Sequence, residues 1–490
     1  MGMRSFLRAG GVRRIGLLLG PVLGLIAWLW LPVGEAGLTP GGRATAAIAA
    51  WMACWWLTQA VPLAVTALLP VVLFPLTGAA SLAEATAPYS RSLIFLFLGG
   101  FILGLGLQRW GVHRRLALLT LLAAGTGPRR LVAGFMLASA GLSLWISNTA
   151  TVIMLLPIGT SVLEMLRERD PDAPERLHRR LSAALLLGIA YAASIGGTGT
   201  LVGTPPNLVL AAFAREHYGY DTTVLEWLGI GLPLVALFLP LTWLFLTRVA
   251  FPLPARPLPG GRELLTRELR DLGPLARGER IVLAVFTLTA AGWILRPQLV
   301  ALTGLEGLSD PVIAMIGALA LFVIPVEPAR GVFAMDWTTA RQVPWDILIL
   351  FGGGLSLAAA IGANGVDRFI AQGFVALQDI PLWLFLLALT GTVVLLTEIT
   401  SNTAVATTLM PILAATALAT GLPAGPLLTA ATLAASCAFM LPVATPPNAI
   451  VFGSGRVTVG QMAGAGIGLN LIATLLVTML VYLGGHLPLP

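Results

Sequence analysis

The sequence has few charged residues and no lysine. Of its 490 residues, 10% are charged and 57% are apolar, whereas about a quarter of a typical soluble domain is charged. This composition leaves too little polar surface to cover a core, so it excludes a soluble enzyme, a disordered chain and a fibrous protein. A membrane span needs about 20 mostly apolar residues. A chain of this length therefore has room for on the order of ten spans.

Cysteine and histidine are also scarce, which excludes several kinds of site. Cys54 and Cys437 lie in separate apolar stretches, and the four histidines form no pair at helical spacing. The sequence therefore predicts neither a disulfide framework nor a cysteine or histidine metal site. Without lysine it cannot form the phosphate-binding Gly-Lys-Ser/Thr loop of an ATPase. Since it also shows no nucleophile paired with a base, we expect a protein that is not an enzyme and uses no organic cofactor.

All 29 basic residues are arginines, and they cluster between the apolar runs. Such clusters mark the cytoplasmic side of a membrane protein, so the net charge of +7 needs no nucleic acid as a partner. We assign the N-terminus, 109–130, 167–180 and 256–280 to the cytoplasm. The first apolar run, Ile15–Val33, has the length of a retained span rather than a cleaved signal. The sequence thus predicts a multi-pass protein of the inner (plasma) membrane with a cytoplasmic N-terminus.

Short motifs recur in the same order in the two halves of the chain. Phe-Leu-Gly-Gly at 97–100 corresponds to Phe-Gly-Gly-Gly at 351–354, and Ser-Asn-Thr-Ala at 147–150 recurs at 401–404. A proline follows each second motif, and these three matches share one spacing of 254 positions. Thr-Pro-Pro-Asn at 204–207 recurs 241 positions later, at 445–448. Matches in register indicate a tandem structural repeat.

The arginine clusters predict how the repeats lie in the membrane. In the first half, Ser-Asn-Thr divides 131–166 into two arms that are short for spans, and both flanks are cytoplasmic. We therefore expect a re-entrant hairpin. The stretch 382–420 has the same shape, but its flanks carry only Asp367, Arg368 and Asp379, so this hairpin is expected to enter from the opposite side. Inverted repeats of this kind are typical of secondary transporters.

The predicted fold is an all-α polytopic membrane protein. It has about 11 transmembrane helices plus two re-entrant helical hairpins in an inverted-topology repeat. The predicted segments are an N-terminal segment with the first transmembrane helix at 1–43, a first repeat at 44–252 with hairpin 131–166 and broken helix 181–214, a cytoplasmic amphipathic connector at 253–280, and a second repeat at 281–490 with hairpin 382–420 and broken helix 427–455.

The Ser-Asn-Thr motifs suit the tips of such hairpins. Their side chains form hydrogen bonds without carrying charge, and serine and asparagine are common helix caps. If the second arm begins right after each motif, its free N–H groups point at the tip and can bind an anion. Two tips that meet at the membrane midplane can then hold the two ends of a dianion.

The Thr-Pro-Pro-Asn motifs are predicted to break helices. Two prolines remove two backbone donors and disfavour helical geometry at the preceding threonine, which frees carbonyl groups to coordinate a cation. Glycines between 196 and 203 loosen the first break, and Pro442-Val443-Ala444 occupies the second. A plain proline kink is the simpler alternative, but its repetition after each Ser-Asn-Thr favours a functional site.

Glu398 lies in an otherwise apolar arm, three positions before Ser401. A carboxylate inside the membrane is a candidate proton carrier or cation ligand, and a structural, hydrogen-bonded glutamate is an equally good interpretation. The first half has Leu144 in this register.

These features resemble the divalent anion/sodium symporter family, and in particular its di- and tricarboxylate branch. The resemblance rests on the paired motifs and on the segments WDILILFGGG (345–354) and LTEITSNTA (396–404), and it spans about 44–486. It implies a homodimer with a scaffold domain at the interface. It also implies a mobile transport domain that moves as an elevator across the lipid bilayer.

The resemblance implies particular site residues as well. One site for co-transported sodium would use Ser143, Ser147, Asn148 and Gly203, and the other Thr397, Thr400, Ser401, Asn402 and Ala444. The substrate carboxylates would be held by Ser147, Asn148, Thr149, Thr204, Pro205, Ser401, Asn402, Thr403, Thr445 and Pro446. The leading interpretation is a sodium-coupled importer of C4-dicarboxylates such as succinate. The alternatives are a sodium-independent dicarboxylate exchanger, a carrier of sulfate or another divalent anion, and an anion channel.

Overall fold

The computed structural model describes residues 3–34, 37–125, 127–169, 174–254, 261–372 and 380–490. Residues 255–260 of the expected connector and the flanking Asp379 lie outside this part of the chain. Within it the chain is helical apart from a small two-stranded antiparallel sheet. The predicted all-α class is confirmed.

The elements of the first half begin and end as follows: α1 (Met3–Trp30), α2 (Pro40–Thr58), α3 (Leu63–Thr66), α4 (Leu69–Thr77), α5 (Leu82–Thr86), η1 (Ala87–Ser90), α6 (Ser92–Arg109), α7 (Val112–Ala124), α8 (Pro128–Ser143), α9 (Asn148–Arg169), α10 (Glu175–Gly197), α11 (Pro205–Tyr218), α12 (Val224–Leu244) and the π-helical η2 (Phe245–Ala250).

Those of the second half are α13 (Gly261–Asp271), α14 (Arg277–Ile294), α15 (Arg296–Thr303), α16 (Asp310–Val323), β1 (Pro325–Glu327), η3 (Pro328–Arg330), β2 (Val332–Phe333), α17 (Trp337–Ala340), α18 (Trp345–Ala363), α19 (Val366–Gln372), α20 (Leu382–Thr397), α21 (Asn402–Thr420), α22 (Ala424–Ala435), α23 (Pro446–Gly453) and α24 (Val459–Tyr482).

Many of these helices are suited to a membrane. In the described ranges, eight are long and apolar enough to cross one, or nine if the bent pair α14 and α15 forms a single span. The multi-span fold is thus confirmed, whereas the number of about 11 spans stays a prediction. Several expected spans are shorter helices, because turns and breaks divide them. A helix such as α16, with 14 residues, extends only about 21 Å.

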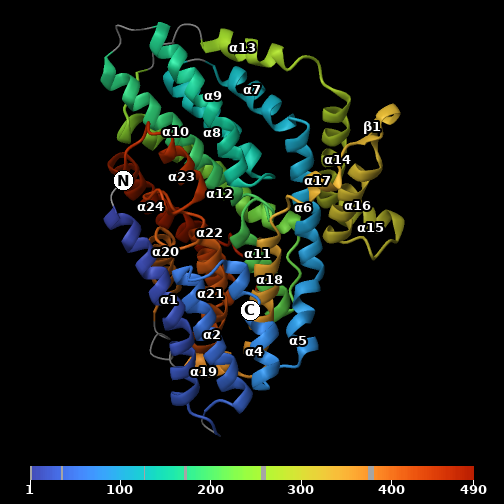
Figure 1. Ribbon diagram of the computed structural model, residues 1–490, viewed down its shortest axis with the longest axis vertical. Helices are drawn as coiled ribbons and strands as arrows, with labels where there is room; N and C mark the ends of the chain where they lie inside the picture. The colour runs from blue at the N-terminus through green and yellow to red at the C-terminus, as the bar shows by residue number, and fades with distance from the viewer. Residues whose placement is uncertain (1–2, 35–36, 126, 170–173, 255–260, 373–379) are drawn as a thin grey trace.

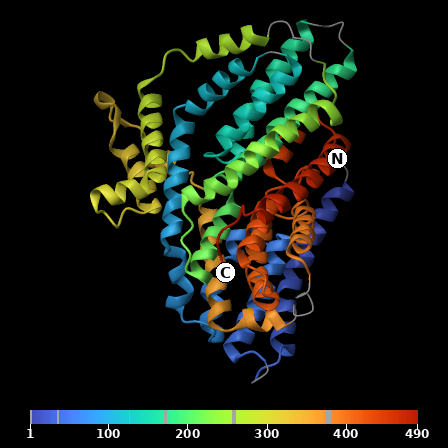
Figure 2. The ribbon, with the colours of Figure 1, turned by 180° about the vertical axis from the view of Figure 1, so that it is seen from behind.

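The two predicted hairpins lie in opposite halves of the molecule. Figure 1 shows α8 and α9 above the centre and α20 and α21 below it, and the reverse view in Figure 2 agrees. In both views α14, α15 and α16 protrude to one side together with the strands. Helices also end near the expected breaks: α10 stops at Gly197 and α22 at Ala435, and each Thr-Pro-Pro-Asn motif starts a new helix.

The core runs through the helices that carry these breaks. Of the apolar window in α10, 89% is buried, compared with 17% in α1. The small residues of α10 permit this packing, because a β-carbon at Gly196 would collide with the backbone of Ala140 in α8. The apolar faces that remain exposed, as on α1, suit contact with lipid.

Candidate substrate and cation sites

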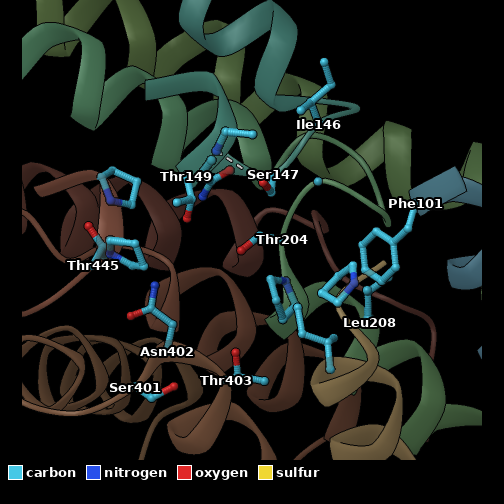
Figure 3. Close-up of a pocket in the computed structure, with 18 of the residues that line it drawn as sticks. Phe101, Ile146, Ser147, Thr149, Thr204, Leu208, Ser401, Asn402, Thr403 and Thr445 are labelled. Atoms are coloured by element: carbon cyan, nitrogen blue, oxygen red, sulfur yellow. Dashed lines mark hydrogen bonds between the residues drawn. The ribbon is translucent and has the colours of Figure 1, made fainter. Parts of the chain in front are cut away.

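A cavity of about 800 Å³ lies between the two hairpin tips. In Figure 3, Ser147 and Thr149 of the first tip face the group formed by Ser401, Asn402 and Thr403 of the second. The threonines of both Thr-Pro-Pro-Asn motifs lie between them (Figure 3). All ten residues expected to hold carboxylates line this cavity: Ser147, Asn148, Thr149, Thr204, Pro205, Ser401, Asn402, Thr403, Thr445 and Pro446.

Each tip is a helix N-terminus capped by its serine. Ser147 Oγ accepts a hydrogen bond from the Ala150 N–H at 3.3 Å, and Ser401 Oγ accepts one from the Ala404 N–H at 3.5 Å. Helices α9 and α21 therefore begin inside the motif, at the asparagine, and not right after the motif as the sequence suggested. Because the serine is the cap, asparagine and threonine occupy the first turn. The N–H groups of that turn lack partners within the helix, and the cavity lies beside them.

The two asparagines connect each tip to the arm before it. The Ser143 hydroxyl donates to Asn148 Oδ1, and the Thr397 hydroxyl donates to Asn402 Oδ1 at 2.7 Å. Both hydroxyl residues are fully buried and lie behind the cavity wall, whereas the remaining residues expected at the cation sites line it. The same five-residue spacing thus produces the same contact in both repeats.

In the first repeat, oxygen atoms converge where the helix is broken. A β-carbon at Gly203 would lie 2.5 Å from the Gly197 carbonyl oxygen and 2.9 Å from that of Ser143. A β-carbon at Gly197 would lie 2.6 Å from Asn148 Oδ1 and 3.1 Å from the Gly203 carbonyl oxygen. Glycine is therefore required at both positions, and the oxygens that approach them are of the kind that coordinates sodium at unwound helices.

Side chains from other helices hold this first break in place. Asn207 Nδ2 donates to the carbonyls of Gly197, Thr198 and Thr200, the last at 2.7 Å. The Trp227 indole N–H also donates to the Thr198 carbonyl, at 3.0 Å. The motif asparagine thus acts on the backbone of the break itself, and its oxygen Oδ1 is buried without a partner in the described structure.

The second break has a different set of supports. Asn448 Nδ2 donates to the carbonyls of Ala438 and Leu441, at 3.2 and 3.1 Å, as Asn207 does in the first. Thr397 Oγ1 also lies 2.8 Å from the Ala435 carbonyl oxygen, so its single hydroxyl hydrogen serves either this carbonyl or Asn402 Oδ1. The carboxylate of Glu398 accepts hydrogen bonds from backbone N–H groups of this break and does not line the cavity. The structure thus favours the hydrogen-bonded, structural interpretation of Glu398.

Sequence reasoning missed the rest of the cavity wall. Gln59, Gln108 and Gln342 line it, together with apolar residues such as Phe101 and Trp145. Each glutamine is a single polar residue outside the repeated motifs, so no pattern in the chain marks it. Among the described residues that line the cavity, none carries a charge.

Comparison with known proteins identifies the family. The family described as the sodium:sulfate symporter transmembrane region matches residues 13–487. The chain belongs to this symporter family. The resemblance seen in the paired motifs is therefore confirmed, and the match extends beyond the segment that carries them.

Curated relatives cover nearly the whole chain. The sodium-dependent dicarboxylate transporter SdcS of Staphylococcus aureus (strain USA300) is 39% identical over 473 residues, which cover 96% of this chain and 90% of the relative. A transporter of the same name from Staphylococcus saprophyticus is 38% identical with the same coverage. Among solved structures, the Alcanivorax borkumensis YdaH transporter superposes with a TM-score of 0.57 at 15% identity, covering 97% of both chains. This last likeness concerns the fold.

Proposed function

We propose that this member of the symporter family imports C4-dicarboxylates such as succinate together with sodium ions. The observation that carries the proposal is the cavity, where two capped helix N-termini face each other and the described lining is uncharged. The dicarboxylate transporters at 38–39% identity support both the substrate and the ion. In this proposal the ten residues of the two tips and the two Thr-Pro-Pro-Asn motifs bind the carboxylates.

Charge explains why sodium is needed. A dicarboxylate brings two negative charges into a cavity whose described lining carries no positive charge. Burial of an unpaired charge is costly. Each helix N-terminus offers only about half a positive charge. Mobile cations therefore provide the missing charge. In the first repeat we assign the ion to the oxygens of Ser143, Ser147, Asn148 and Gly203, and in the second to those of Thr397, Thr400, Ser401, Asn402 and Ala444.

We further infer the organisation of transport. The hairpins enter the plasma membrane from opposite sides, with the N-terminus in the cytoplasm. Both hairpins and both broken helices move together as an elevator against a scaffold in a homodimer. This inference is supported by the placement of α8–α9 and α20–α21 in opposite halves (Figure 1). A hydrogen bond from Tyr191 Oη in α10 to the Phe439 carbonyl, 2.7 Å long, supports a single mobile unit because it joins the two repeats.

Uptake of labelled succinate into proteoliposomes tests the proposal. We expect accumulation driven by an inward sodium gradient and little uptake when choline replaces sodium. Undiminished uptake in choline that requires internal dicarboxylate would instead identify an exchanger. Uptake of labelled sulfate but not of labelled succinate would identify a carrier of inorganic divalent anions.

A further inference from the structure

Glu398 is a buried carboxylate surrounded by hydrogen-bond donors. Its side chain is 3% exposed. Its oxygens accept from the N–H groups of Phe439, Met440 and Leu441 at 2.6, 2.8 and 3.0 Å, and from Asn470 Nδ2 at 2.8 Å. The ion pairs found among the described residues do not include it.

The nature of these partners indicates the charge state of Glu398. All four contacts are donors, and an ionised carboxylate only accepts hydrogen bonds. A protonated acid would need an acceptor for its own hydrogen, and no such contact is present in the described structure. Hydrogen bonds from backbone N–H groups to a carboxylate are charge-assisted and strong.

The break is also held from its other side. The Ala438 carbonyl accepts from Asn448 Nδ2 at 3.2 Å, and the Phe439 carbonyl accepts from Tyr191 Oη at 2.7 Å. In a trans peptide unit the N–H and C=O groups point in opposite directions. Glu398 therefore fixes the N–H side of the same peptide units whose carbonyl side Asn448 and Tyr191 fix. The hydrogen bonds of Glu398 thus join the second break to the end of hairpin arm α20 and, through Asn470, to α24.

We propose that Glu398 is an ionised positioning residue, which holds the second break against the second hairpin tip and thereby sets the sodium affinity of the second repeat. It carries no proton across the membrane and does not touch the ion. The inference rests on the proposed function, because it assumes sodium binding between this tip and this break. Leu144 occupies the equivalent register and cannot accept hydrogen bonds through its side chain. The first repeat therefore has no carboxylate at this position to hold its break.

The test begins with Glu398→Gln, which keeps the shape but turns an amide N–H₂ toward backbone donors. A hydrogen bond to a charged group is stronger than one to a neutral group, so the sodium concentration for half-maximal succinate binding should rise on the order of tenfold or more. Glu398→Asp, which keeps the charge, should show a smaller rise. Leu395→Gln is the matched control, because it puts the same side chain on the same arm at a position that is 64% exposed. Its sodium dependence should equal that of the wild type.

Two further measurements, an infrared difference spectrum and a melting temperature, do not depend on transport. In the infrared difference spectrum between the wild type and Glu398→Gln, we expect the loss of an ionised carboxylate band. Loss of a protonated carboxylic acid band, or an unchanged sodium dependence in Glu398→Gln, would overturn the proposal. If that variant does not fold, Asn470→Ala removes one donor and should raise the half-maximal sodium concentration less; no rise would count against the proposal.

The sodium-induced rise in melting temperature, measured without succinate, separates this inference from the proposed function. We expect the rise to shrink in Glu398→Gln and to persist in Leu395→Gln. If sodium changed neither the succinate binding nor the melting temperature of the wild type, the proposed function would be refuted. The role of Glu398 in sodium affinity would be refuted with it. The infrared spectrum would then still decide whether Glu398 is an ionised anchor.

Discussion

The two repeats share their hairpin tips but differ in how they hold the adjacent helix break. At the tips, a buried hydroxyl contacts the motif asparagine five positions later in both halves. At the first break, the backbone approaches so closely that Gly197 and Gly203 leave no room for a β-carbon. At the second, an alanine replaces Gly203 and a carboxylate binds three successive N–H groups.

This difference teaches that one backbone arrangement can be stabilised in two ways. In the first repeat, the absence of side chains permits close packing of backbone oxygens. In the second, Glu398 supplies the hydrogen bonds that the unwound backbone needs. The Ser-Asn-Thr tips, which line the cavity, are equal in both repeats, which indicates that they are under the same functional constraint.

The largest effect is expected where the repeats agree. Asn148→Ala and Asn402→Ala each remove an amide that connects a tip to its arm and faces the cavity. Each loses its hydrogen bond to the arm together with the proposed contacts to anion and cation, so we expect uptake to fall by about 100-fold or more. Size-exclusion chromatography must show that both variants remain folded. Near-normal uptake by either folded variant would refute the assignment of the tips as the binding site.

The next largest effect should differ between the two repeats, because their breaks differ at Gly203 and Ala444. Gly203→Ala places a β-carbon 2.5 Å from the Gly197 carbonyl oxygen, and overpacking of this kind costs about 1–3 kcal/mol. We expect loss of sodium-stimulated uptake by about tenfold or more. The reciprocal change, Ala444→Gly, should alter the sodium dependence only a few-fold. Equal responses of the two variants would mean that the breaks do not differ in the way described.

The buried hydroxyls should show a smaller difference. Thr397 Oγ1 contacts both Asn402 Oδ1 and the Ala435 carbonyl, whereas Ser143 Oγ contacts Asn148 Oδ1. Each hydroxyl has a single hydrogen to donate, and a hydrogen bond contributes about 1 kcal/mol, but Thr397→Val leaves two buried acceptors without that hydrogen and Ser143→Ala leaves one. We therefore expect Thr397→Val to raise the sodium concentration for half-maximal uptake more than Ser143→Ala does, with both effects below that of Gly203→Ala. A larger effect of Ser143→Ala would contradict this order.

The smallest effect concerns the contact between the repeats. Tyr191→Phe removes the hydrogen bond to the Phe439 carbonyl and should lower the free energy of unfolding by about 1–2 kcal/mol. A melting temperature lower by a few degrees would be the expected result. Tyr482→Phe is the control, because Tyr482 is 53% exposed. Equal melting temperatures of the two variants would show that the contact between the repeats does not stabilise the fold.

Much of the architecture and of the cavity could be predicted from the sequence, because repeated motifs carried the information. Ser-Asn-Thr and Thr-Pro-Pro-Asn marked the helix ends that surround the cavity. The supports behind them could not be predicted, since they depend on contacts between distant positions. Glu398 meets Asn470 across 72 positions. Asn470 had a signal of its own, as a lone amide in an apolar run, but its partner could only be seen in three dimensions.

The aromatic donors at the two breaks record how the repeats diverged after duplication. Phe439 lies 241 positions after Thr198, the spacing that relates the two Thr-Pro-Pro-Asn motifs. The carbonyl of Phe439 accepts from Tyr191, and that of Thr198 accepts from Trp227. A buried carbonyl must keep a donor, but the residue that supplies it has changed between the copies. Exchange of one break for the other within this chain would therefore separate each carbonyl from its own aromatic partner, so the duplicated halves have lost their interchangeability while keeping their geometry.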